Sequence, residues 1–206
     1  MSIWTCKAAC LGFVLSLAAC DGGFDIGGLG VSRAAPDQIL LADGLVVAGA
    51  EGWCVDLSSS RSVQTSNVVV LGSCAAIAKN ANAPRPSVPG VMTVSVEGPG
   101  QKAPPADALE SCFETDDGLA VLARDGNADS VRLLETKRDG EMLYLHAVDN
   151  SVLPGATANY WRALFGLNGR LVSVTHLGIA DQPYNSTEGL AALQSQIEEL
   201  IAANAA

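Results

Sequence analysis

Basic residues are scarce in this sequence of 206 residues. Lys and Arg together number 12 against 22 Asp and Glu, which gives a formal net charge of −10. The longest basic cluster is the pair Lys137-Arg138. A nucleic-acid-binding surface needs clustered cations that displace counterions from the phosphate backbone. The composition therefore argues against DNA or RNA as a partner.

Motifs that support catalysis are also lacking. The chain has two histidines, His146 and His176, and neither belongs to a His-x-His or His-Glu-x-x-His spacing. No serine lies in a Gly-x-Ser-x-Gly or Ser-x-x-Lys arrangement, which are the patterns that activate a serine nucleophile. We therefore expect a protein that is not an enzyme and that carries no metal or cofactor.

Long apolar runs are missing as well. A short one, Ala8 to Ala18, follows the single charge of Lys7 and precedes the next charge at Asp21. It spans 11 residues, about half of the roughly 20 that a membrane-spanning helix needs. A cationic start, a short apolar segment and small residues after it are typical of a secretory signal peptide, which we assign to residues 1–19.

The end of this leader resembles the lipobox of bacterial lipoproteins. Leu17-Ala18-Ala19-Cys20 gives an aliphatic residue, two small residues and then the cysteine. The resemblance implies cleavage before Cys20 and acylation, by palmitate or a similar chain, of its thiol and of the new amino terminus. Two or more acyl chains hold a soluble domain on a membrane stably. The alternative is ordinary cleavage after Ala18, which would leave Cys20 as a plain secreted thiol.

The resemblance also places the protein in the bacterial envelope. We expect it to be lipid-anchored to the membrane through Cys20 and to face the periplasm. Asp21 resembles the sorting signal that keeps some bacterial lipoproteins in the inner membrane, so the inner membrane is favoured and the outer membrane stays open. Residues 20–36 are rich in glycine and small side chains, which predicts a flexible linker. Residues 37–206 are expected to form a single globular domain.

The cysteines can be sorted once the leader and the lipid are accounted for. Cys54, Cys74 and Cys112 remain, an odd number in an oxidising compartment. Cys54 and Cys74 each lie at the edge of an apparent strand, and we predict a disulfide between them. Cys112 shares a helical face with apolar neighbours and is expected to be a buried thiol. Without lipidation, four cysteines would remain and two bridges would become possible.

Turn signals and periodicity predict an α+β fold. Hairpin turns are expected at Asp43-Gly44, Asp139-Gly140 and Asn168-Gly169, and strands at 67–74 and 91–98. Helices are expected after Pro104-Pro105, around 118–124, and after Asn185, which forms a capping box with Glu188. The apolar face of the last helix consists of Leu190, Leu193, Ile197, Leu200 and Ile201. The result is an antiparallel β-sheet with helices packed on one or both faces.

The C-terminal part of the chain resembles the PsbP-like fold of membrane-associated accessory proteins. The residues that carry this likeness are "YWRALFGLNGRLVSVTHLG", the closing helix, and "GWCVD" as an early strand. The resemblance implies an α-β-α sandwich and a role in assisting membrane complexes. We therefore expect a non-catalytic accessory or binding lipoprotein of an envelope protein complex. The alternative is a periplasmic enzyme or metal-binding protein using His146 and His176 with nearby carboxylates.

One loop partly matches a calcium-binding loop, and calcium binding stays an alternative interpretation of it. Asp125, Asn127 and Asp129 match oxygen positions 1, 3 and 5 of a calcium-binding loop. Ser130 replaces the turn glycine at position 6 and Thr136 replaces the bidentate glutamate at position 12. The same residue types make good turns, which is the main prediction here. The large aromatic side chains Trp53, Tyr160 and Trp161 are expected to pack in the core.

Overall fold

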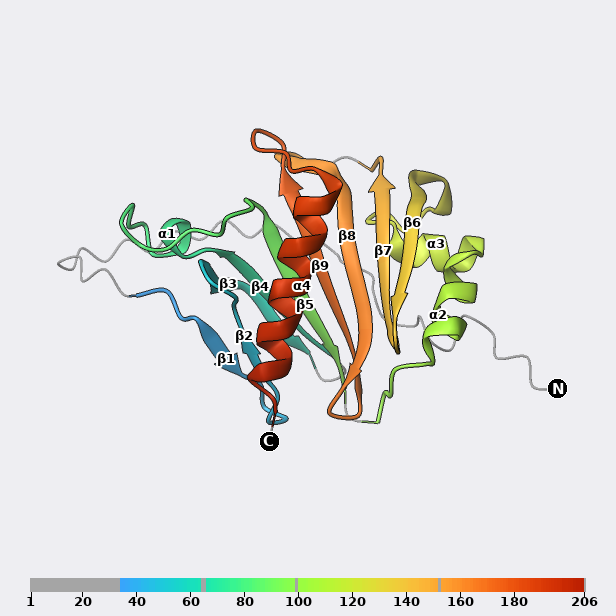
Figure 1. The fold of residues 1–206 in the computed structure, drawn as a ribbon, viewed down its shortest axis with the longest axis horizontal. Coiled ribbons are helices and arrows are strands. Elements are labelled where there is room, and N and C mark those ends of the chain that lie inside the picture. The colour runs from blue at the N-terminus through green and yellow to red at the C-terminus, as the bar shows by residue number, and fades with distance from the viewer. Residues whose placement is uncertain (1–33, 64–65, 99, 152, 206) are drawn as a thin grey trace.

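The structure is a computed structural model that describes residues 34–63, 66–98, 100–151 and 153–205 (Figure 1). The predicted signal peptide, Cys20 and residues 20–33 of the predicted linker lie outside the described residues. Pro36, at the end of that linker, already contacts the domain, because its carbonyl oxygen accepts a hydrogen bond of 2.8 Å from the Val55 backbone.

An antiparallel sheet of seven strands forms the centre of the domain, in the order β3-β4-β5-β9-β8-β7-β6. A separate two-stranded sheet pairs β1 with β2. The α+β class predicted from the sequence is confirmed. The strands are β1 (Gln38–Leu40), β2 (Val46–Ala48), β3 (Trp53–Val63), β4 (Ser66–Ser73), β5 (Val91–Glu97), β6 (Val131–Asp139), β7 (Met142–Asp149), β8 (Ala156–Leu167) and β9 (Arg170–Ile179).

The three predicted hairpins are present. Asn168 and Gly169, between β8 and β9, both have positive φ angles of 49° and 75°. Two successive left-handed residues match the right-handed twist of the flanking strands, and asparagine and glycine tolerate that conformation best. The turn therefore sets the register of β8 against β9 directly from local sequence.

Four α-helices and a short 3-10 helix complete the fold: α1 (Cys74–Ile77), α2 (Ala106–Phe113), α3 (Asp116–Leu122), η2 (Ala128–Ser130) and α4 (Ser186–Ala202). The capping box of α4 is confirmed, with Asn185 and Glu188 exchanging two hydrogen bonds of 3.0 Å. Its predicted apolar face is wrong at Ile201, which is 40% exposed. The polar Gln196 is buried instead, because it serves a backbone partner described below.

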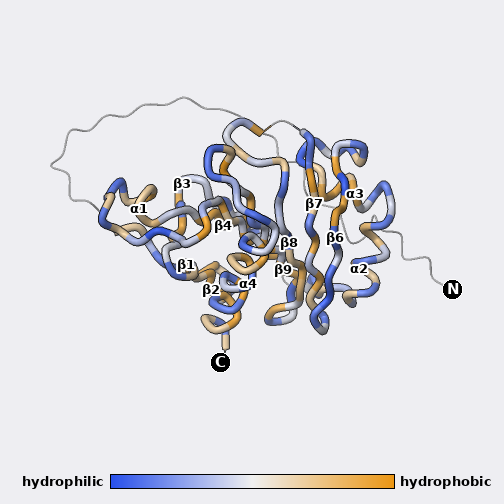
Figure 2. The backbone as a smooth tube through the Cα atoms, turned by 45° about the horizontal axis from the view of Figure 1, so that its top comes forward, coloured by the Kyte–Doolittle hydropathy of each residue, from blue (hydrophilic) through white to orange (hydrophobic). Residues whose placement is uncertain are grey.

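Two hydrophobic cores lie on opposite faces of the sheet (Figure 1). One fills the space between the sheet, α4 and the β1–β2 hairpin, and includes Trp53, Met92, Trp161 and Leu193. The other lies under α2 and α3 at the β6–β8 side of the sheet, and includes Phe113. Helices therefore cover both faces. Figure 2 shows the apolar stretches running through the central strands, with hydrophilic segments along the edge strand β6.

Two carboxamides fasten the β1–β2 hairpin to α4. Gln196 Nε2 donates to the Ala48 carbonyl at 2.6 Å, and Gln196 Oε1 accepts from the Ala50 backbone at 3.0 Å. Asn204 bonds to Val46 in the same way: its Nδ2 donates to the Val46 carbonyl at 2.7 Å, and its Oδ1 accepts from the Val46 backbone N–H at 2.9 Å. The side chains thus act like a third strand beside β2. Buried backbone groups need such partners, so the hairpin is fixed to the helix by polar as well as apolar contacts.

An ion pair between the exposed Arg124, just after α3, and the buried Asp149 fixes the end of α3 to β7. The Asp149 carboxylate accepts from both the Nε and the backbone of Arg124, at 2.9 Å and 2.8 Å. Burial alone would raise the pKa of Asp149, but the hydrogen bonds from Ser151 and Arg124 outweigh burial and lower it. The folded protein therefore stabilises the charged form of the Asp149 carboxylate.

Candidate functional site

The two histidines lie in one row across the sheet, but an aromatic ring separates them. His146 on β7 pairs with Trp161 on β8, and Trp161 pairs with His176 on β9. The His146 ring stacks on Trp161 with a centroid distance of 4.6 Å. Because Trp161 occupies the position between them, the histidines do not converge on a common ligand site. Among the described residues, no group of three or more His, Cys, Asp or Glu side chains is arranged to hold a metal ion.

His176 is enclosed by aromatic rings. It is fully buried, stacks on Tyr184 at 4.5 Å and meets Trp53 edge-on at 5.7 Å. Its Nδ1 lies 3.2 Å from the Gly189 carbonyl, which is the geometry of an Nδ1–H donor. Its Nε2 has no well-formed hydrogen bond in the described structure, although the Pro89 carbonyl is near enough to affect the pKa of the ring. Burial lowers the pKa of His176, and the carbonyls of Gly189 and Pro89 oppose this decrease without reversing it.

In the loop that resembles a calcium site, side-chain oxygens of Asp125 and Asn127 accept hydrogen bonds from the loop itself. Asp125 accepts from the Asn127 backbone at 3.0 Å and from the Ser130 hydroxyl at 2.7 Å, and Asn127 accepts from the Asp129 backbone at 3.1 Å. These bonds lower the pKa of Asp125, the Ser130 hydroxyl most of all. This is the turn that the residue types predicted.

The cysteines follow the prediction in one respect and depart from it in another. Cys54 at the start of β3 and Cys74 at the start of α1 form the expected disulfide, with a Cα–Cα distance of 4.8 Å. Cys112 was expected to be a buried free thiol on α2. It is half-buried and disulfide-bonded, so that expectation is wrong. Helical spacing identified the correct helix but could not reveal how much of the side chain its neighbours leave exposed.

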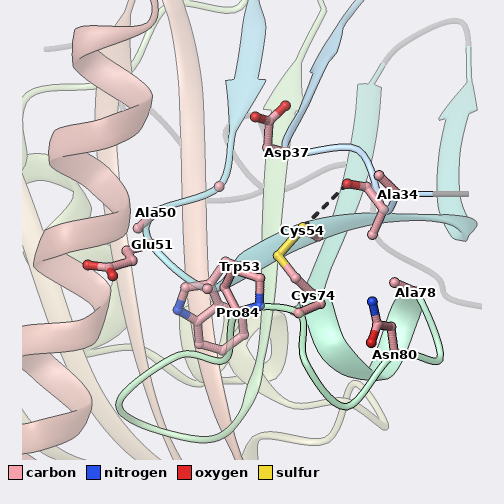
Figure 3. Close-up of a pocket in the computed structure, with 14 residues that line it drawn as sticks. Ala34, Asp37, Ala50, Glu51, Trp53, Cys54, Cys74, Ala78, Asn80 and Pro84 are labelled. Atoms are coloured by element: carbon pink, nitrogen blue, oxygen red, sulfur yellow. Dashed lines mark hydrogen bonds between the residues drawn. A yellow bond between two sulfur atoms is a disulfide. The ribbon is translucent and has the colours of Figure 1, made fainter.

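A cavity of about 530 Å³ lies beside the Cys54–Cys74 disulfide (Figure 3). Four segments that are distant in sequence meet there: the first described residues, the turn between β2 and β3, the disulfide with α1, and the loop after α1. The lining consists of Ala34, Ala35, Asp37, Gly49, Ala50, Glu51, Gly52, Trp53, Cys54, Cys74, Ala78, Asn80, Ala83 and Pro84. None of these has a hydroxyl, imidazole or amine that could act as a nucleophile or general base.

The chemistry of the cavity is that of small apolar side chains, backbone groups and one disulfide. The Cys54 sulfur lies 3.6 Å from the Ala35 carbonyl oxygen. Because a disulfide sulfur carries no hydrogen, this approach is a packing contact. The carboxylates of Asp37 and Glu51 stand at the margin and point away from α1 (Figure 3). The small apolar side chains and backbone groups are suited to holding a chain segment or a small neutral group, and the ionisable side chains of the lining are the carboxylates of Asp37 and Glu51.

No family model, no curated protein and no solved structure matches this chain. Within the described part of the chain, none of the helices is long and apolar enough to cross a membrane.

The sequence predicted the Cys54–Cys74 disulfide and singled out both histidines as candidate site residues. It did not predict the cavity. The cavity depends on how four separated segments meet, and no short stretch of the sequence shows that they do. A side chain at position 52 would overlap the Arg85 carbonyl, so glycine is required where the turn touches the loop after α1. That requirement is visible only once the fold is known.

Proposed function

We propose that the protein is a lipoprotein of the bacterial envelope, anchored through Cys20, whose domain faces the periplasm as a non-catalytic accessory or binding module. The observation that carries this proposal is the sequence Leu17-Ala18-Ala19-Cys20 directly after a short apolar leader and directly before a glycine-rich segment. The inner membrane is favoured by Asp21.

The geometry of the domain supports a binding role over catalysis. His146 and His176 are held apart by Trp161, and each ring is already engaged in aromatic stacking. The cavity beside the disulfide is lined by groups that contact a ligand without activating one. An accessory protein needs stable, specific surfaces, and this domain offers an ordered framework for them.

The test is membrane fractionation of the full chain and of two cysteine variants, with mass spectrometry of the mature amino terminus. Cys20→Ser should release the protein into the soluble fraction and abolish acylation, because the lipid has lost its attachment atom. Cys10→Ser is the matched control, since it changes a leader cysteine outside the lipobox and should leave fractionation unchanged. Membrane retention of the Cys20→Ser protein, or a wild-type Cys20 that is joined to Cys112 and carries no lipid, would refute the proposal. The disulfide-bonded state of Cys112 makes that pairing the alternative that mass spectrometry has to exclude.

A further inference from the structure

The segment between α1 and β5, residues 79–90, forms an exposed loop that we call the basic loop. It contains Lys79 and Arg85 but no Asp or Glu, although acidic residues outnumber basic ones in the chain as a whole. Both basic side chains are exposed, and neither takes part in an ion pair among the described residues.

The basic loop is held in a fixed position. It follows α1, which is tied to β3 by the disulfide at Cys74. The Pro84 carbonyl accepts from the Ala75 backbone at 3.1 Å, and Asn80 donates to the Ala75 carbonyl at 3.0 Å. The Arg85 backbone packs directly against Gly52. Lys79 and Arg85 are therefore displayed from a braced framework, which lowers the entropy cost of using them in binding.

The basic loop lies at the end of the domain where the chain enters. Ala34 and Ala35 line the same cavity as Asn80 and Pro84. The first described residues and α1 lie at one end of the molecule, and α2 and α3 lie at the other (Figure 1). The basic loop therefore lies close to the point at which the chain before residue 34 joins the domain.

Charge is distributed unevenly between these two ends. Residues 106–130, which contain α2, α3 and η2, carry seven acidic side chains and a single basic one, Arg124. Arg124 is paired with Asp149. At the entry end, Lys79 and Arg85 offset the exposed carboxylates of Asp37 and Glu51. An anionic surface would therefore repel the end with α2 and α3 more strongly than the end where the chain enters.

We propose that the basic loop contacts the anionic phospholipid head groups of the membrane that anchors the protein, and so orients the domain with α2 and α3 outward. This inference rests on the proposed lipidation of Cys20. Thirteen residues lie between Cys20 and Ala34, so even a fully extended tether reaches at most about 50 Å. Each basic residue near an anionic surface strengthens attraction about fivefold, so two favour this orientation by roughly 25-fold.

The test is photocrosslinking of the full lipidated chain in vesicles. A benzophenone amino acid is placed at Ser87 in the basic loop or at Ser111 on α2, both of which are exposed. In vesicles containing about one third phosphatidylglycerol, a ratio of lipid adducts at Ser87 to those at Ser111 of tenfold or more is expected. The ratio should fall at least fivefold in purely zwitterionic vesicles and in the Lys79→Gln/Arg85→Gln variant.

The matched control is Arg132→Gln/Lys137→Gln, which removes the same two charges from β6 at the opposite edge of the sheet and should not lower the ratio. Equal labelling at both positions, or a ratio that neither lipid charge nor the loop variant alters, would overturn the inference. Flotation of the same samples tests the anchor separately. A wild type that floats but labels evenly refutes only the orientation, whereas a wild type that does not float refutes the anchor and the orientation that rests on it.

Discussion

The enclosed histidine on β9 should make the stability of the domain depend on pH. His176 is fully buried, and the groups that face it are the rings of Trp53 and Tyr184 and the backbone at Gly189 and Pro89. No charged side chain among the described residues shifts its pKa. The protonated imidazolium would therefore be buried without a counter-charge, which is costly.

The sign follows from proton binding in the two states. In the folded protein, burial lowers the pKa of His176 below its ordinary value of 6.5. Near and below pH 6.5 the unfolded chain therefore binds a proton that the folded chain does not bind. Stability is therefore complete above the unfolded pKa and is lost as the pH falls below it. If the folded ring stays neutral, the free energy of unfolding decreases by about 1.4 kcal/mol between about pH 7.5 and about pH 5.5.

The assay is urea unfolding at these two pH values, followed by the fluorescence of the buried Trp53 and Trp161. His176→Gln should abolish most of the pH dependence, whatever it does to stability at pH about 7.5, because the comparison is made within one variant. His146→Gln is the control. Burial also lowers the pKa of His146, with Glu135 opposing, but this ring is half-buried and solvent screens its charge. A wild type without pH dependence, or one whose dependence survives His176→Gln and disappears with His146→Gln, would refute the reasoning.

Two further predictions concern the framework at the entry end. Gln196→Leu should destabilise the domain by about 1–3 kcal/mol, because it leaves buried backbone groups of Ala48 and Ala50 without partners. Hydrogen exchange should then accelerate at Ala50 more than in β8, and uniform exchange would contradict this. Replacing Cys54 and Cys74 together by Ser should cost about 3 kcal/mol for a loop of 20 residues, measured by urea unfolding. An unchanged midpoint would show that the disulfide does not constrain the unfolded chain.

Local signals made the hairpins and the last helix predictable. The Asn168-Gly169 turn has two residues, so the pairing of β8 with β9 can be counted outward from it: Trp161 and His176 each lie seven positions away and face each other. The capping box of α4 is equally local, since Asn185 and Glu188 lie three residues apart. In each case one short stretch of chain holds all the atoms that decide the geometry.

The remaining features depend on partners far away in sequence. Gln196 is polar and yet buried, because the backbone that it serves lies 146 and 148 residues earlier. Ile201 continues the apolar pattern of α4 and yet stays exposed, because none of the described elements covers that part of the helix. His146 faces Trp161 through β7 and β8, whose connection has no two-residue turn from which to count. Periodicity identifies the inward face of an element but not what lies opposite it.

The entry of the chain into the domain is braced in a way that suits a tethered protein. The Pro36 carbonyl accepts a hydrogen bond from the Val55 backbone of β3. The Asp37 carbonyl accepts a hydrogen bond of 2.8 Å from the Gly49 backbone, next to β2. β2 in turn is fixed to α4 by Gln196 and Asn204. A pull on the residues before 34 is therefore shared between the edge strand of the main sheet and the C-terminal helix.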